Sequence, residues 1–143
     1  MALTATANEK VVNDAIRCLG MTNPYRYVSS FNRPNLRYQV LKKDSKTIDA
    51  IASYVTKRGQ DSGVIYCLSR KDCERVAEQL QEKGVTASFY HAELDTHERE
   101  RRHHDWSNGR ISVLCATIAF GMGIDKPDVR TYTVVPMHVC MHV

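Results

Sequence analysis

Three short apolar runs, separated by segments with helical spacing, constrain the fold of this chain more than any other feature of its sequence. The runs are Val64–Leu68, Thr86–Tyr90 and Ile111–Ala116. Between them, apolar residues recur every three or four positions, as they do on one face of an amphipathic helix. The order strand, helix, strand, helix, strand is typical of a parallel sheet with crossover helices. The sequence therefore predicts an α/β fold.

The composition is that of an ordinary soluble globular domain with a slightly basic charge. The 143 residues suffice for one domain with a hydrophobic core, and a net charge of +4 is compatible with a polyanionic partner. No apolar run is long enough to span a bilayer and no secretory signal opens the chain, so we expect neither membrane insertion nor secretion. Five cysteines, an odd number without a C-x-x-C pair, favour a reducing compartment.

The segment 113–130 opens as a buried strand and ends as a loop that contains glycine. Thr117 offers a hydroxyl where the strand ends, Gly121 and Gly123 follow, and Asp125 adds a carboxylate. Two glycines this close let a phosphate, a ribose or another backbone approach. Ligands of open α/β sheets bind outside the carboxyl ends of the strands. The pattern therefore indicates a site for a polar ligand, with a tight turn as the alternative interpretation.

A second candidate site follows the run Val64–Leu68. Ser69 is placed to cap the next helix, with Asp72 three residues further on, and Arg70 comes directly after the cap. Free backbone N–H groups and the helix dipole favour an anion at such a helix start. Ser69 and Arg70 are therefore candidates to hold a nucleic-acid phosphate, and a plain helix cap with a solvated charge is the alternative.

Four segments resemble characteristic motifs of RecQ-family DNA helicases. The strongest match is Ala116–Arg130, which reads Ala-Thr-Ile-Ala-Phe-Gly-Met-Gly-Ile-Asp-Lys-Pro-Asp-Val-Arg and resembles motif V nearly residue for residue. Ser30–Leu36 resembles the segment that joins the two RecA-like lobes, Ile65–Arg70 resembles motif IV, and Leu3–Ala7 resembles motif III. The resemblance implies a RecA-like three-layer α/β/α fold with a mainly parallel sheet.

The same resemblance implies a division of the chain. Residues 1–24 correspond to the tail of the first RecA-like lobe, and residues 25–143 correspond to the second lobe, the helicase C-terminal domain. After Arg130 the resemblance ends, and motif VI, which supplies an arginine finger in the family, is absent. We therefore expect a fragment whose second lobe is truncated before motif VI and ends in a divergent tail at 131–143.

The resemblance implies which residues meet the DNA. Ser69, Arg70 and Thr117 stand at motif positions that contact the DNA backbone in the family. The expected partners are therefore single-stranded or forked DNA and the missing first RecA-like lobe.

Other motif residues are implied to face the nucleotide or to respond to it. Gly121, Gly123 and Asp125 would face the cleft between the lobes, and Thr4 and Thr6 would couple the state of the nucleotide to the DNA. ATP and Mg²⁺ are the cofactors of the intact family enzyme, bound mainly by the missing first lobe.

The function implied by the resemblance is part of an ATP-dependent 3′-to-5′ DNA helicase that serves recombination, repair and replication in the nucleus. The chain has no G-x-x-x-x-G-K-[ST] loop and no acidic Mg²⁺-binding box, so we expect no ATP hydrolysis by the chain alone. We expect no metal site, because the histidines between 97 and 104 lack partners at ligand spacing. The alternatives are a non-catalytic module that binds single-stranded nucleic acid or a partner, and the second lobe of an RNA helicase.

Three local expectations complete the sequence-based picture. Tyr25–Phe31 is expected to form a strand, and the charge-dense segment that starts near Asp95 is expected to form a solvated helix held by Trp106. Glu93 stands where the family usually has glycine, so a positive φ at this position would strain the loop by about 1 kcal/mol. His91 is either a polar residue near the DNA path or a hydrogen-bonded loop histidine.

Overall fold

The chain divides into two compact units in a computed structural model, and each unit is described by itself. The units are Met1–Arg33 and Pro34–Val143. The structure describes all residues except 5, 31, 33, 41–43, 60, 118–119, 122–123, 125, 135–138 and 143, and it describes the side chains of all remaining residues except 38, 131–132, 134 and 139–142.

The described residues of the first unit contain one helix, α1 (Glu9–Cys18), which begins directly after Asn8, a residue type that favours helix N-caps. The Asn8 side chain caps this helix by accepting a hydrogen bond from the backbone N–H of Val11 at 3.0 Å. Arg26, beyond the helix, reaches back to Glu9 at 3.2 Å and to Asn13 at 3.1 Å. No residue of α1 is buried, although its apolar positions lie on one face.

The predicted strand at Tyr25–Phe31 is wrong for the part of it that the structure describes. Residues 25–30 have no regular secondary structure. The side chains of Tyr25, Tyr27 and Val28 are 90%, 78% and 80% exposed. An extended segment becomes a strand when a neighbouring segment takes up its N–H and C=O groups, and none of the described residues pairs with this one.

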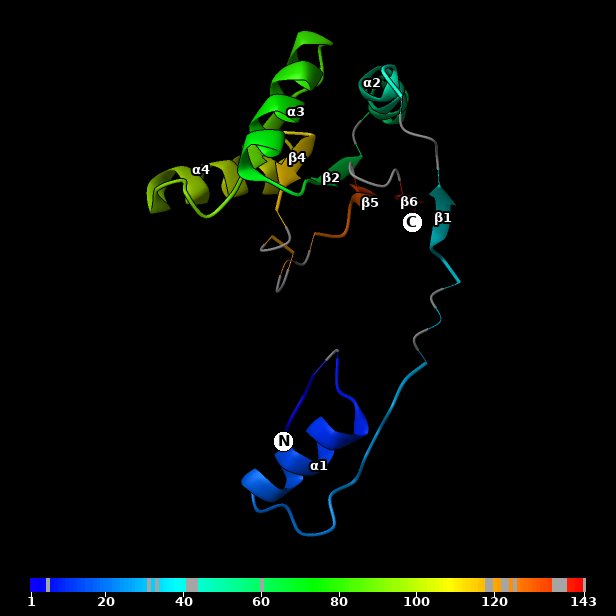
Figure 1. The fold of residues 1–143 in the computed structure, drawn as a ribbon, viewed down its shortest axis with the longest axis vertical. Helices are drawn as coiled ribbons and strands as arrows, with labels where there is room; N and C mark the ends of the chain where they lie inside the picture. The colour runs from blue at the N-terminus through cyan, green and yellow to red at the C-terminus, as the bar shows by residue number, and fades with distance from the viewer. Residues whose placement is uncertain are drawn as a thin grey trace. The chain divides into compact units, whose positions relative to one another are not determined.

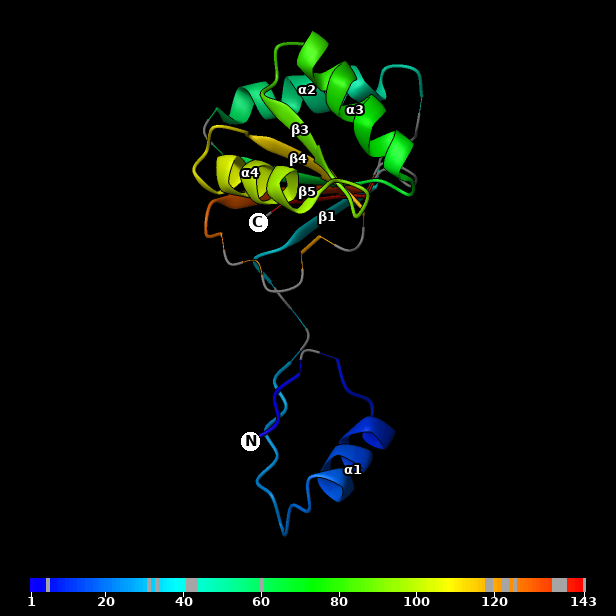
Figure 2. The same cartoon turned by 90° about the vertical axis from the view of Figure 1, so that its left-hand side faces the viewer.

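The second unit is built on a six-stranded sheet, shown in Figures 1 and 2. In sheet order the strands are β1-β6-β5-β2-β4-β3. Four of them, β5, β2, β4 and β3, run parallel, whereas β6 pairs antiparallel with both β1 and β5. The bounds are β1 (Arg37–Val40), β2 (Ser62–Tyr66), β3 (Ala87–Tyr90), β4 (Val113–Ala116), β5 (Val129–Val134) and β6 (Val139–His142).

Three helices cover the two faces of this sheet. They are α2 (Thr47–Arg58), α3 (Arg70–Glu82) and α4 (Thr96–Ser107). Helices α2 and α3 lie together over one face, and α4 packs against the other (Figure 2). The three layers confirm the predicted α/β/α fold with a mainly parallel sheet.

Alternate residues of the central strands supply the two halves of the core. Ile65 of β2 and Cys115 of β4 pack under α2 and α3, while Val64 and Leu114 pack with Trp106 of α4. This alternation is the expected result of a strand's two-residue repeat. Burial raises the pKa of the Cys115 thiol, so this cysteine stays protonated and packs as a small apolar side chain, as its position in an apolar run predicts.

Strand β2 begins and ends two residues earlier than the apolar run predicts. It spans Ser62–Tyr66 rather than Val64–Leu68, because Gly63 donates its N–H to the carbonyl of Ser112 at 2.8 Å and Leu68 is 78% exposed beyond the strand.

Across the described residues, no helix is both long enough and apolar enough to cross a membrane.

Candidate nucleic-acid interface

Three loops leave the sheet at the edge where the parallel strands end, which we call the carboxyl edge. The register pairs Tyr66 of β2 and Tyr90 of β3 with the same residue, Ala116 of β4. The segments that follow the three strands therefore emerge side by side. They carry Ser69 and Arg70 after β2, Thr117 after β4 and the segment 91–95 after β3.

Ser69 forms the helix cap that the sequence predicts. Its hydroxyl accepts a hydrogen bond from the backbone N–H of Asp72 at 3.1 Å and donates one to the Asp72 carboxylate at 2.7 Å. Arg75 also donates to this carboxylate, at 2.5 Å. The cap is confirmed, whereas contact of Ser69 with a phosphate stays a prediction.

Arg70, the first residue of α3, forms an ion pair that the sequence does not reveal. Its guanidinium contacts the carboxylate of Glu93 in the loop after β3. Both side chains are about half exposed or more, at 52% for Arg70 and 66% for Glu93. The strain considered for Glu93 is absent, because Asn23 is the one non-glycine residue with a positive φ among those described. A glutamate therefore fits this loop and finds a cation there.

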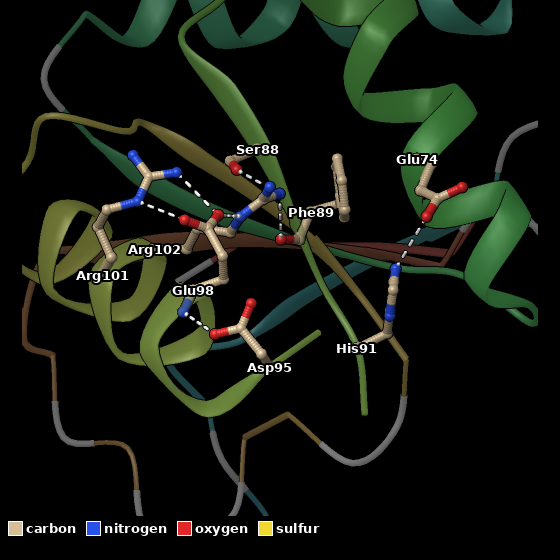
Figure 3. A network of polar contacts seen from close by, with 8 residues as sticks. All are labelled: Glu74, Ser88, Phe89, His91, Asp95, Glu98, Arg101 and Arg102. Atoms are coloured by element: carbon tan, nitrogen blue, oxygen red, sulfur yellow. Dashed lines mark hydrogen bonds and ion pairs between the residues drawn. The ribbon is translucent and has the colours of Figure 1, made fainter. Parts of the chain in front are cut away.

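The loop between β3 and α4 is held at both of its ends (Figure 3). At its start, His91 is buried, stacks on the Phe89 ring with centroids 5.4 Å apart, and places Nε2 3.2 Å from the Glu74 carboxylate of α3. At its end, the Asp95 side chain caps α4 by accepting a hydrogen bond from the N–H of Glu98 at 2.9 Å. Of the two interpretations of His91, the structure supports a hydrogen-bonded loop histidine. Its contact with Glu74 fixes the loop to α3.

Arg102 ties α4 to β3 beneath the same loop. Its Nη1 donates to the Phe89 carbonyl at 3.2 Å and to the Ser88 hydroxyl at 3.3 Å, and its guanidinium lies 3.9 Å from the centroid of the Phe89 ring (Figure 3). The Glu98 carboxylate, one turn earlier on the helix, accepts a hydrogen bond from Arg102 at 3.1 Å and two from Arg101 at 2.8 and 2.9 Å. The mixed charges of α4 therefore pair with one another, as the solvated-helix interpretation predicts. The sequence did carry a signal for the pairing of Glu98 with Arg102, because side chains four residues apart on a helix are neighbours.

The hydrogen bonds of Glu98 predict how the stability of the fold depends on pH in acid. Hydrogen bonds from Arg101 and then Arg102 lower the pKa of Glu98 from 4.5 to about 2. Because the folded-state pKa is the lower one, the stabilisation is complete above pH 4.5 and is lost as the pH falls toward 2. We expect Glu98→Gln to lower the melting temperature by a constant amount above pH 5, and the difference from the wild type to shrink between pH 4.5 and 2.

Circular dichroism melts of both proteins from pH 2 to 7 measure this difference. Glu100→Gln is the matched control, because Glu100 is exposed on the same helix and forms no ion pair with another described residue. A Glu98→Gln deficit that persists undiminished at pH 2, or an equal deficit in the control, would contradict the prediction.

The loop after β4 is fixed to β2 by a tyrosine that the sequence analysis did not single out. The backbone turns directly after the strand, where Phe120 donates its N–H to the carbonyl of Thr117 at 3.0 Å. Tyr66 then donates its hydroxyl to the Phe120 carbonyl, also at 3.0 Å. Gly121 follows with φ +128°, and a Cβ there would lie 2.6 Å from the Tyr66 hydroxyl. Tyr66 therefore holds the loop that carries Thr117, and only glycine fits at 121.

The end of the segment that resembles motif V is joined to the start of β2. Lys126, whose side chain is 9% exposed, places Nζ 2.6 Å from both carboxylate oxygens of Asp128. Asp128 in turn accepts a hydrogen bond from the Ser62 hydroxyl at 2.9 Å. The segment thus runs from the carboxyl edge to the opposite edge of the sheet and is held at both.

The remaining predicted site residues are only partly placed. Gly123 and Asp125 lie outside the described residues. Thr4 and Thr6 belong to the first unit, where the Thr4 hydroxyl accepts a hydrogen bond from the N–H of Thr6 at 3.1 Å. Within the described part of the chain, no group of three His, Cys, Asp or Glu side chains could hold a metal ion.

A known family of domains matches most of this chain. The family described as the helicase conserved C-terminal domain matches residues 43–138, about two thirds of the chain. The chain belongs to the helicase C-terminal domain family. Its carboxyl edge and its motif V loop are therefore parts of a helicase lobe.

Curated relatives of this helicase C-terminal domain are RecQ-type helicases, which confirms the resemblance drawn from the motifs. The chain is 50% identical over 133 residues to the RecQ-like DNA helicase BLM of Xenopus laevis and 46% identical over 135 residues to the ATP-dependent DNA helicase Q-like 2 of Arabidopsis thaliana. Each alignment covers 91% of this chain but only 10% and 19% of the relative. The chain thus spans a fifth or less of the length of these two proteins.

Solved structures share the fold. Saccharomyces cerevisiae Dbp5 bound to RNA and ADP BeF3 superposes with a TM-score of 0.75 over 92% of this chain and 34% of that chain, at 23% identity. The C-terminal domain of the DEAD-box protein Dbp5 matches 66% of this chain and 52% of that one, with a TM-score of 0.54 and 26% identity. The second unit is therefore a RecA-like helicase C-terminal lobe.

Proposed function

We propose that this helicase C-terminal domain is the second lobe of a RecQ-type, ATP-dependent 3′-to-5′ DNA helicase and that its carboxyl edge holds the backbone of one DNA strand. In this proposal residues 25–143 belong to that lobe, with the compact unit Pro34–Val143 as its body, and residues 1–24 are the tail of the first lobe. The observation that supports the DNA contact is the strand register, which brings the loops of Ser69, Arg70 and Thr117 out at one edge.

The chemistry of that edge suits a phosphate backbone. The Arg70 guanidinium offers charge-assisted hydrogen bonds, Thr117 offers a half-buried hydroxyl, and the N-terminus of α3 adds free N–H groups. Phosphate contacts of this kind position a strand without reading its sequence. A helicase needs such contacts because it moves along any sequence.

The partner lobe and the nucleotide belong to the same proposal. Gly121, Gly123 and Asp125 face the nucleotide in the cleft with the first lobe, which binds most of the ATP and Mg²⁺, and Thr4 and Thr6 couple the state of the nucleotide to the DNA. Helix α1 has an apolar face with no buried residue, so it needs a partner to cover it, and the first lobe is that partner. We infer a nuclear role in DNA recombination, repair and replication from the eukaryotic RecQ relatives.

The test is single-stranded DNA binding, followed by fluorescence anisotropy over a series of salt concentrations. We expect the wild-type chain to bind more weakly as salt rises, and Arg70→Ala to weaken binding about threefold and to lower the slope of log K against log salt by about 0.7. Alanine is compatible with a first helical turn, so circular dichroism should report an intact fold for the variant.

Lys71→Ala is the matched comparison, since it removes the neighbouring exposed cation from the same helix. Salt-independent binding, or an unchanged slope in Arg70→Ala, would contradict the proposed contact. A DNA-stimulated ATPase in the purified chain would overturn the expectation that this lobe is inactive alone. Competition between DNA and RNA strands separates the proposal from the RNA-helicase alternative, which predicts a preference for RNA.

A further inference from the structure

Glu93 sets a carboxylate against the cation proposed for DNA contact. Arg70 is the first residue of α3, at the end of the helix where the dipole favours an anion. The Glu93 carboxylate contacts the Arg70 guanidinium there. Both side chains remain about half exposed or more, so solvent and ligands reach the pair. The chain's own carboxylate therefore occupies the guanidinium that a phosphate would bind.

The position of Glu93 is imposed by the loop that carries it. His91, two residues earlier, is buried and bonded to Glu74 of α3, while Asp95, two residues later, caps α4 (Figure 3). Leu94 donates its backbone N–H to the His91 carbonyl at 3.3 Å, which closes the loop into a turn. Because both ends are held, the backbone at Glu93 loses little further conformational entropy when the side chain meets Arg70.

The charges around Arg70 make this ion pair consequential. Arg75, one turn further along α3, pairs with Asp72. Lys71 is exposed and forms no ion pair with another residue in the described part of the chain. With Glu93 in place, two of the three cations in the first two turns of α3 are therefore neutralised.

We propose that Glu93 restrains the binding of single-stranded nucleic acid by holding Arg70, so that a backbone phosphate must displace this carboxylate to reach the guanidinium. The inference rests on the proposed DNA contact at the carboxyl edge and adds a residue that sets its strength. An exposed ion pair is weak, so a phosphate can displace it.

The test is a double-mutant cycle on DNA affinity, with Glu93→Gln, Arg70→Ala and the double variant. We expect Glu93→Gln to tighten the binding of a single-stranded oligonucleotide about threefold, because a phosphate no longer has to displace a carboxylate from Arg70. The salt slope should stay as steep as in the wild type, because Arg70 meets a phosphate in both proteins. Without Arg70 the gain from Glu93→Gln should fall to the small effect of removing one negative charge.

Glu82→Gln measures that small effect. Glu82 is the last residue of α3, exposed and about 18 Å from Arg70 along the helix, and its substitution changes the net charge equally. Glu93→Ala serves as a second variant, and circular dichroism checks the fold of all of them.

Each outcome bears on a different part of the proposal. Equal gains for Glu93→Gln and Glu82→Gln, or the same Glu93→Gln gain with and without Arg70, would overturn the role of Glu93 while leaving the DNA contact intact. Failure of both the wild type and Glu93→Gln to bind would overturn the DNA contact itself. Salt-dependent binding that is tighter in Glu93→Gln than in the wild type, with the gain lost in the double variant, supports both.

Discussion

Replacing Trp106 with alanine should lower the free energy of unfolding by about 3–5 kcal/mol, the cost of deleting a large buried side chain. Trp106 is fully buried between α4 and the sheet, and it is the only tryptophan in the chain. Its ring lies edge-on to Phe120 with centroids 5.5 Å apart, and its Nε1 donates to the carbonyl of Gly63 in β2 at 3.3 Å. The Lys126 ammonium lies 5.5 Å from the ring centroid.

The expected loss is a large fraction of the stability of a typical domain, about 5–15 kcal/mol, so the variant should be only marginally folded. Urea unfolding followed by circular dichroism measures it, because the variant has no tryptophan fluorescence. Trp106→Phe is the control, and it should cost clearly less because it keeps an aromatic ring in the same space. A loss below about 1 kcal/mol for Trp106→Ala would mean that α4 does not depend on this contact for packing.

Gly121→Ala should destabilise the second unit by about 2–4 kcal/mol, combining backbone strain with a lost hydrogen bond. At φ +128° any L-residue is strained, and the new Cβ would lie 2.6 Å from the Tyr66 hydroxyl. The tyrosine must then move away and give up its hydrogen bond to the Phe120 carbonyl. The loop that carries Thr117 would lose its attachment to β2.

A double-mutant cycle separates the two causes. Tyr66→Phe removes the hydroxyl, so Gly121→Ala in that background should cost about 1 kcal/mol less, with backbone strain alone remaining. Gly109→Ala is the matched control, because Gly109 also has a positive φ, +75°, but a methyl group added there would meet no atom within 4 Å. Urea unfolding gives all four values. An identical cost of Gly121→Ala in both Tyr66 backgrounds would rule out the steric contact.

The local elements were predictable because their signals are local. Short apolar runs predicted the central strands, and the helical spacing of apolar residues predicted the helices. Asn8, Ser69 and Asp95 cap helices as their positions indicate. Capping and periodicity act within a few residues, so the sequence carries them directly. The motif resemblance to RecQ helicases, confirmed by the family and its relatives, supplied the fold class and the candidate residues.

Contacts between distant segments were decided by the tertiary structure. The parallel register of β2, β4 and β3 determines that Glu93 meets Arg70, and the packing of the motif V loop determines that Tyr66 reaches Phe120. No spacing rule links residues so far apart, because their meeting depends on strand order. The predicted strand at 25–31 failed for the same reason over its described residues, since a strand exists only with a partner. The sequence determined the elements and the family, and the sheet order determined which side chains share an edge.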